Sequence, residues 1–231
     1  SGNAGESSNF LCYRALRLNY YAVTGLLARV CLYAGQRENA FNYSTEVIKA
    51  SNNGIFPFVD RSLVNGTAQD PDRIFSPEVL FALSDSQRGE LFEEYFDPSL
   101  APNMVFRMET DLLEQTIYGG TGTGGNLDDY RCRSNWISSG SARYFYKYSD
   151  MTESGRIENT MIPLLRLGEM YLIAAESQSN SLANGVSYIN TLRKNRGVSN
   201  LQTLTTTLLQ YEYIREVYGE GQLFFMYKRM Y

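Results

Sequence analysis

The chain has 231 residues, of which 43% are hydrophobic and 13% aromatic, and this composition excludes an intrinsically disordered protein. The net charge is −4 with no long run of like charge, so no basic stripe is present to neutralise the phosphates of a nucleic acid. Histidine is absent, which removes the commonest general base and most zinc and iron sites. We therefore expect no enzyme, no metal site and no cofactor.

The three cysteines, Cys12, Cys31 and Cys132, are widely spaced and form neither a metal motif nor a disulfide framework. Cys31 lies in a helical apolar pattern and is predicted to be a buried thiol. The first eight residues are polar and contain no hydrophobic signal core. Cys12 lacks the small residues that precede a lipid-modified cysteine, so we expect any targeting sequence to lie outside this chain.

Residues 14–50 are predicted to form a hairpin of two antiparallel helices. Residues 14–34 and 37–50 both have helical apolar spacing, and Gly35 separates them. The small residues Ala22, Gly25 and Ala28 would let a partner helix approach closely. The apolar stripe of the first helix consists of Leu16, Tyr20, Val23, Leu27, Val30 and Ala34.

Residues 51–160 change character and are predicted to form a loop-rich insertion, because turn signals follow one another closely. Residues 77–85 suit either a strand or a helical turn, and 109–116 form a weak helical fragment. The glycine-rich run 119–125 lacks the lysine of a phosphate-binding loop and is predicted to be a flexible surface loop. Alternating tyrosines predict a strand with one aromatic face at Tyr144, Tyr146 and Tyr148.

Residues 161–177 are predicted to form the central, buried helix, because apolar residues leave it almost no polar face. Pro163 suits the first helical turn, and Arg166 and Glu169 would share a face and pair. Further helices are expected at 184–196, 205–218 and 221–231. The predicted fold is therefore all-α, with tetratricopeptide-like helical hairpins and an irregular, loop-rich insertion containing short strands. We expect one domain over 1–231, made of the hairpin 14–50, the insertion 51–160 and the C-terminal helices 161–231.

Several segments, in the same order, resemble the motifs of the SusD/RagB family. The sequence IPLLRLGEMYLIAAES at 162–177 resembles that family's signature helix, and YINTLRKNRGV at 188–198 resembles the helix that follows it. The other similar segments are the hairpin at 19–48, EVLFALS at 78–84, DDYR at 128–131 and the segment 204–230.

This resemblance implies a surface-exposed lipoprotein of the outer membrane that binds glycan or another nutrient without catalysis. It would deliver an oligosaccharide to a TonB-dependent SusC-like transporter and be held at the membrane by a lipid anchor outside this chain. Family members are longer, so the chain is expected to be the C-terminal portion of a larger SusD-like protein. The alternative is a tetratricopeptide-like scaffold that binds a protein partner and has no sugar site.

The resemblance also implies where a glycan would bind, since aromatic rings stack on the apolar faces of sugars. The candidate rings are Trp136, Tyr130, Tyr144 and Tyr146, with Arg133 and Asn135 as hydrogen-bonding neighbours. In the alternative interpretation, Trp136 instead fills the joint between the insertion and the helices.

Charged residues on the C-terminal helices could be mistaken for an acid–base site. We interpret the pair Arg166 and Glu169, and the group Arg215, Glu216 and Glu220, as structural ties between helices, because a glycosidase pair must converge across a cleft.

Overall fold

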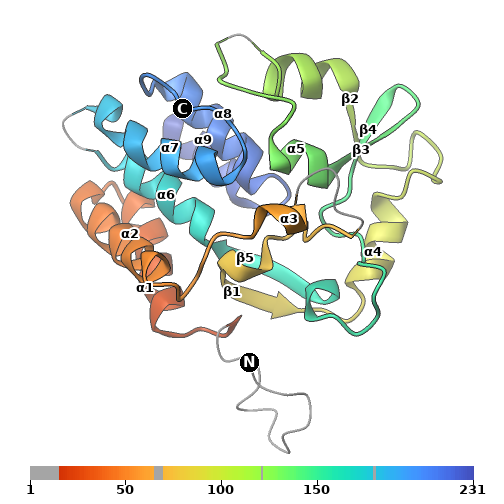
Figure 1. Ribbon diagram of the computed structural model, residues 1–231, viewed down its shortest axis with the longest axis horizontal. Helices are drawn as coiled ribbons and strands as arrows, with labels where there is room; N and C mark the ends of the chain where they lie inside the picture. The colour runs from red at the N-terminus through yellow and green to blue at the C-terminus, as the bar shows by residue number, and fades with distance from the viewer. Residues whose placement is uncertain (1–15, 65–69, 121, 179–180) are drawn as a thin grey trace, which may run out of the picture.

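The computed structural model describes residues 16–64, 70–120, 122–178 and 181–231. The helices of the two chain ends gather on one side of the molecule, and the loop-rich middle of the chain forms the other side (Figure 1). Cys12 lies outside the described residues, whereas Cys31 and Cys132 are both buried and free. The expectation of a buried thiol at Cys31 is confirmed.

The longer helices are α1 (Tyr20–Tyr33), α2 (Arg37–Asn52), α4 (Arg88–Tyr95), α6 (Leu167–Glu176), α7 (Val186–Asn195), α8 (Thr206–Val217) and α9 (Gln222–Met230). Short helical elements are α3 (Arg61–Val64), η2 (Ser76–Glu78), η3 (Leu112–Ile117), α5 (Tyr130–Asn135), η4 (Ile157–Asn159) and η5 (Leu182–Gly185). The strands are β1 (Val79–Ser84), β2 (Arg107–Glu109), β3 (Trp136–Ser139), β4 (Ala142–Phe145) and β5 (Met161–Arg166). This content, with helices dominant and strands short, confirms the predicted fold class.

The first two helices form the predicted hairpin, but α1 turns its apolar stripe outward. The Asn19 side chain caps α1 by accepting from the N–H of Ala22 at 3.0 Å, and Gly35 makes the turn to α2 with φ +75°. Val23 and Val30 of the stripe are 41% and 54% exposed. The 3–4 spacing therefore predicts the helix correctly and its buried face wrongly.

The small residues of α1 explain this orientation. A Cβ added at Gly25 would lie 2.7 Å from Leu165 and 3.2 Å from the sulfur of Met170. The face of α1 that carries Ala22, Gly25 and Ala28 thus packs against β5 and α6 as well as against α2. Because small side chains on this face let the backbones approach closely, the large apolar side chains of α1 lie on the opposite face.

The expected helix at 161–177 is a strand followed by a helix. β5 pairs antiparallel with β1, and Pro163 lies opposite Ala82 in this two-stranded sheet. Pro163 is tolerated there because a two-stranded sheet consists only of edge strands. The apolar run in β5 alternates between buried and half-buried positions, which is the strand period. The helical prediction was wrong for 161–166 and right for α6.

The expected pair between Arg166 and Glu169 is also absent. Arg166 has extended backbone at φ −130° and ψ 157°, so the two residues do not share a helical face. Glu169 instead receives Arg29 from α1 at 2.6 Å. Arg166 pairs with glutamates of α8 and of the turn after it.

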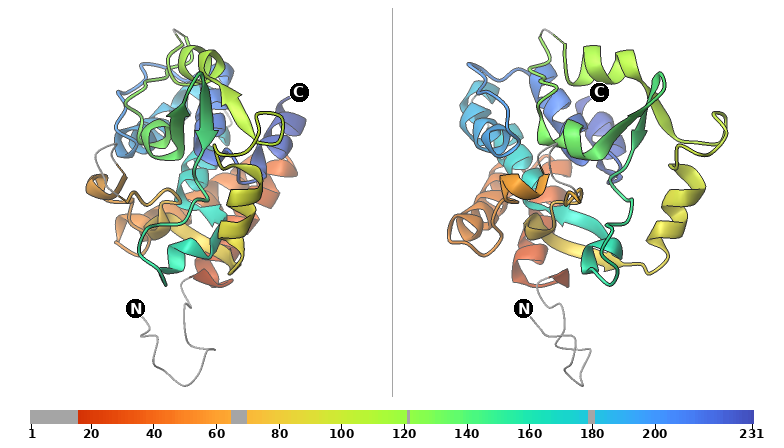
Figure 2. Two further views of the ribbon diagram at one scale, coloured as in Figure 1. Left: turned by 90° about the vertical axis from the view of Figure 1, so that its right-hand side faces the viewer. Right: turned by 45° about the vertical axis from the view of Figure 1, so that its right-hand side comes forward.

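The second sheet has the order β2-β4-β3 and lies in the insertion, as Figure 2 shows. The strand expected through Tyr144, Tyr146 and Tyr148 ends at Phe145. Tyr144 is buried, while Tyr146 and Tyr148 are half-buried beyond the strand, so one continuous aromatic face does not form.

Helix α6 is the centre of the largest hydrophobic core, as the sequence predicts for its part of 161–177. Every residue of α6 from Leu167 to Ala175 is buried, and α2, α7 and α8 pack around it. The core joins the hairpin to the C-terminal helices. The insertion attaches to this helical body through ring contacts such as that of Trp136 with Tyr218 and through the charged residues described next.

Candidate functional site

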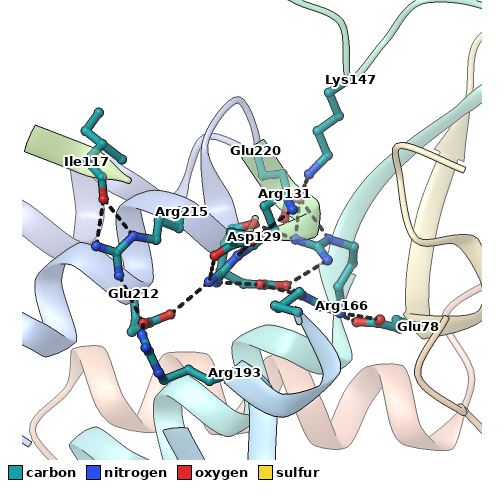
Figure 3. Close-up of polar contacts among 12 residues, drawn as sticks. Glu78, Ile117, Asp129, Arg131, Lys147, Arg166, Arg193, Glu212, Arg215 and Glu220 are labelled. Carbon is teal, nitrogen blue, oxygen red and sulfur yellow. Dashed lines mark hydrogen bonds and ion pairs between the residues drawn. The ribbon is translucent and has the colours of Figure 1, made fainter. Parts of the chain in front are cut away.

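The most densely charged part of the described structure is a buried network at the junction of the insertion and the helical body (Figure 3). Six cations and five carboxylates form it, and we call it the buried ionic network. The carboxylates are Glu78, Asp129, Glu212, Glu216 and Glu220; the cations are Arg131, Lys147, Arg166, Arg193, Arg196 and Arg215.

Glu216 of α8 is the centre of this network. Its carboxylate accepts from Arg166 at 3.0 Å, from Arg196 at 2.7 and 3.0 Å, and from Arg131 at 3.1 Å. Burial alone would raise the pKa of Glu216, but Arg196 and Arg166 hold that pKa well below its ordinary value. Glu216 is therefore an ionised acceptor with fixed partners, not a proton donor.

The remaining ion pairs fasten separate elements to α8 and to one another. Arg196 binds Glu78 through two nitrogens at 2.6 and 2.7 Å, which joins the end of α7 to the start of β1. Arg131 binds Asp129 at 2.6 Å within the turn that opens α5, and Asp129 also caps that helix. Arg215 donates from α8 to the carbonyl of Ile117 at 2.6 Å (Figure 3). These contacts agree with the interpretation of Arg215, Glu216 and Glu220 as structural ties.

Two sequence-predicted site residues of α5 and β3 lie inside the protein. Trp136 is 5% exposed and its ring lies 5.0 Å from both Phe145 and Tyr218, centroid to centroid. This agrees with the alternative interpretation, in which Trp136 fills the joint between insertion and helices. Asn135 is buried and its carbonyl accepts from the N–H of Tyr146 at 2.8 Å. Glycan contact at Trp136 would require its neighbouring rings to separate, so its binding role stays a prediction.

Three further candidates differ in their surroundings. Tyr144 is buried against Val105. Tyr130 is half-buried, and its ring covers Gly197, where an added Cβ would lie 2.5 Å from the ring. Arg133 is exposed and pairs with Asp128. The structure thus does not bring the six predicted residues together into one surface.

Tyr146, the sixth candidate, is half-buried and packs on Phe92 of α4, next to an aromatic cluster at the end of this helix that the sequence analysis missed. We call Tyr95, Phe96, Phe106 and Tyr146 the α4 aromatic surface. Phe106 is 64% and Tyr95 39% exposed, and Phe106 lies 6.1 Å from Tyr95 and 5.7 Å from Phe96 between ring centroids. The buried ring of Phe92 contacts both Phe96 and Tyr146 from below.

A folded-back loop builds this surface. The N–H of Phe106 donates to the carbonyl of Tyr95 at 2.8 Å, which closes the loop between α4 and β2. Asp97 starts the loop by accepting from the N–H of Ser99 at 2.7 Å, and hydrogen bonding to the side chain and backbone of Ser99 lowers the pKa of Asp97. Local hydrogen bonds therefore hold the loop that carries Phe106 against the end of α4.

Polar groups stand beside the rings. The Arg73 guanidinium lies 5.9 Å from the centre of the Tyr146 ring and donates to the carbonyl of Ser134 at 3.1 Å. Burial and the nearby Asp97 carboxylate raise the pKa of Tyr146, so its hydroxyl is a neutral donor at physiological pH. Exposed rings with hydroxyl, guanidinium and carboxylate neighbours suit a ligand with apolar faces and many hydroxyls.

A groove of about 500 Å³ opens at the other end of the insertion, between β1 and residues 150–161. Two of its charged groups are paired with residues outside the lining: Asp150 accepts from Arg88 at 3.1 Å, and Arg156 donates to Glu158 at 3.1 Å. No aromatic ring is among the described residues that line it. It suits sugar stacking less well than the α4 aromatic surface.

Within the described residues, no group of cysteine, aspartate and glutamate side chains is arranged to hold a metal ion. The same part of the chain contains no helix with the length and apolar character that crossing a bilayer requires.

Comparison with known proteins identifies the relatives of this fold. The family model described as the SusD family matches residues 84–231. No curated protein matches the sequence. Among solved structures, a SusD superfamily protein from Bacteroides thetaiotaomicron has 20% sequence identity and a TM-score of 0.66, and the match covers 92% of this chain and 49% of that one.

Two further solved structures have the same fold. A SusD-like carbohydrate binding protein from Bacteroides vulgatus has 18% identity and a TM-score of 0.63, over 96% of this chain and 48% of its own. A laminarin binding SusD-like protein has 18% identity and a TM-score of 0.56, over 91% and 54% respectively. The chain therefore spans about half the length of the solved proteins that it matches.

Proposed function

The chain belongs to the SusD family, and from this premise we propose that it binds a glycan through the α4 aromatic surface. The observation that carries the proposal is the exposure of Phe106 and Tyr95, since rings open to solvent offer faces for sugar stacking. The solved relatives include one described as carbohydrate binding and one as laminarin binding, which supports a glycan as the ligand class.

In the proposed mechanism, the protein captures an oligosaccharide and passes it on chemically unchanged. Exposed rings give modest affinity and fast release, and both are needed for delivery. The receiver would be a SusC-like TonB-dependent transporter in the outer membrane, with the protein held at the cell surface by a lipid anchor outside this chain. Of the six residues suggested by the sequence, Tyr146 is the one that we include in the site.

Titration calorimetry of the natural-length protein tests this proposal, with laminarin as the first probe and a panel of other oligosaccharides after it. Phe106→Ala is the test variant. Ile55→Ala is its control, because Ile55 is a large apolar residue that is 50% exposed and lies just after α2, outside the α4 aromatic surface. We expect Phe106→Ala to weaken binding about tenfold, or ~1.4 kcal/mol, and the control to bind as the wild type does.

Three results would contradict the proposal. These are equal weakening by both variants, unchanged affinity of Phe106→Ala for a glycan that the wild type binds, and turnover of a bound glycan. Thermal melts of both variants show that any loss of binding is not a loss of folding.

A further inference from the structure

The aromatic rings at the end of α4 stand among carboxylates. Residues 89–106 contain most of α4 and the loop that carries Phe106, and this segment has no lysine or arginine. Its acidic residues are Glu90, Glu93, Glu94 and Asp97. The three glutamates are exposed on α4, which lies on the side of the molecule opposite the hairpin of α1 and α2 (Figure 1). Any ligand that reaches the rings therefore meets a negatively charged segment.

Two of these carboxylates lie beside rings of the α4 aromatic surface. Hydrogen bonding to Glu94 raises the pKa of Tyr95, which places the Glu94 carboxylate next to this exposed ring. Burial and the charge of Asp97 raise the pKa of Tyr146, so Asp97 lies near that ring as well. Because hydrogen bonds from Ser99 lower the pKa of Asp97, this carboxyl group is ionised at neutral pH. A sugar stacked on these rings would lie next to negative charge.

The cations near the rings offset this charge only in part. Arg88 is buried, and it donates to Asp150 at 3.1 Å and to the carbonyl of Met161 at 3.1 Å. The Arg73 guanidinium lies 5.9 Å from the centre of the Tyr146 ring, and Arg107 is exposed at the start of β2. Arg73 and Arg107 together balance two of the four carboxylates of residues 89–106, so the surroundings of the rings keep a net negative charge.

Such surroundings repel an anionic ligand, whereas the stacking of a neutral sugar on a ring depends little on them. Glycans divide into neutral ones and anionic ones, which carry uronate carboxylates or sulfate esters. We propose that the α4 aromatic surface selects neutral glycans and rejects anionic ones, with Glu94 and Asp97 as the residues that determine this specificity. This inference rests on the proposed glycan-binding function and adds the charge class of the ligand to it.

Calorimetry with matched oligosaccharides tests the proposal on the natural-length protein. Laminarihexaose, cellohexaose and maltohexaose are each compared with a derivative of the same hexasaccharide in which the C6 hydroxymethyl groups are oxidised to carboxylates. For each hexasaccharide that binds, we expect the neutral form to bind about fivefold more tightly than the oxidised form at low salt. Raising the salt concentration to about 0.5 M should bring this affinity ratio close to one, because the added ions screen the exposed carboxylates.

Variants identify the source of the selectivity. In the double variant Glu94→Gln and Asp97→Asn, the ratio of the two affinities at low salt should fall towards one. Glu38→Gln, at an exposed position of α2, is the matched control and should keep the ratio of the wild type. Thermal melts establish that both proteins are folded, and the salt dependence of the wild type tests the charge effect without any variant.

The possible results separate this inference from the proposed function. An oxidised hexasaccharide that binds as tightly as its neutral form at low salt would overturn the charge selectivity and leave glycan binding in place. A ratio that the folded double variant leaves unchanged would overturn the role of Glu94 and Asp97. Binding of no hexasaccharide of either form would overturn the proposed glycan site, and this inference with it.

Discussion

Arg166 at the end of β5 and Glu216 on α8 are 50 residues apart in the chain, and Arg166 Nη1 lies 3.0 Å from Glu216 Oε1. Both side chains are essentially fully buried. The guanidinium also donates to the carbonyl of Glu216 at 2.6 Å and to Glu220 at 2.8 Å. Arg166 thus ties the end of β5 to α8 and to the turn that follows α8. Because β5 directly follows the insertion, this tie helps to hold the insertion on the helical body.

Replacing Arg166 by methionine should therefore destabilise the protein strongly. Glu216 and Glu220 would each lose a charged partner inside the protein, and breaking a buried pair costs about 3–5 kcal/mol. Urea unfolding at pH 7 measures the loss. Arg37→Met at the exposed start of α2 is the control and should change the free energy of unfolding by less than ~0.5 kcal/mol. A loss below ~1 kcal/mol for Arg166→Met would show that the network does not fasten the insertion.

The pKa of Lys147 shifts in the opposite direction to the raised pKa values of Arg166 and Arg196. Burial lowers its pKa to about 8, despite the contact with Glu220. Between pH 8 and its ordinary pKa of 10.5 the unfolded chain holds a proton that the folded protein has released, so this contribution to stability rises with pH. Below pH 8 the charged Lys147 is the one cation in excess, since the five arginines of the network already balance its five carboxylates.

Comparing wild type with Lys147→Met isolates that effect. The unfolding free energy of the wild type, relative to the variant, should increase by about 2 kcal/mol from pH 7.5 to pH 10. The tyrosines of the unfolded chain also begin to lose protons near pH 10, but they are common to both proteins and cancel in the difference. Lys49→Met, at an exposed position, should show no such trend. A flat difference would mean that Lys147 keeps its ordinary pKa in the folded protein.

Gly197, between α7 and α8, carries two separate constraints. Its φ is +75°, and an added Cβ would lie 2.5 Å from the ring of Tyr130. Gly140 has φ +60° and open space around it, so Gly140→Ala measures the backbone cost alone. We expect Gly197→Ala to cost about 1–3 kcal/mol more than Gly140→Ala in urea unfolding, because the ring must move.

A double variant checks the cause. In Tyr130→Ala combined with Gly197→Ala, the clash is gone, and the cost of the glycine substitution should fall to that of Gly140→Ala. If the cost persists without the ring, the contact with Tyr130 is not its source.

The sequence predicts the helices better than their orientation. The spacing in 14–34 identifies α1, but the buried face depends on Gly25 accepting Leu165 from a strand 140 residues later. Likewise, β5 resembles a helix locally and becomes a strand because β1 is present to pair with it. Pairing partners distant in sequence are not visible in a local apolar pattern.

The candidate site was predictable only in part for a similar reason. Tyr146 belongs to a run of aromatic residues that attracts notice, whereas Tyr95 and Phe106 are separated by ten residues without a pattern. They meet because the Phe106 N–H reaches the Tyr95 carbonyl. Trp136, the most conspicuous residue of the insertion, is buried by Tyr218, which follows α8 far along the chain.

Replacing the buried Trp136 by alanine should mainly lower stability, whereas replacing the exposed Tyr95 by alanine should mainly lower the affinity for a glycan. Removing the buried Trp136 ring leaves a cavity between Phe145 and Tyr218 and should cost about 3–5 kcal/mol in urea unfolding. Tyr95→Ala removes an exposed ring, so its stability should change by less than ~1 kcal/mol while the calorimetric affinity for a glycan falls several-fold.

Trp136→Phe keeps most of the buried volume and supplies the deciding control. If this variant remains folded and binds glycan as the wild type does, Trp136 acts by packing. If it is folded and has lost binding, whereas Tyr95→Ala binds normally, the ligand site is at Trp136 and the joint must open to admit the glycan. Stability and affinity are therefore both measured on Trp136→Ala, Trp136→Phe and Tyr95→Ala. A packing residue is one whose replacement lowers stability, and a binding residue is one whose replacement lowers affinity while the protein stays folded.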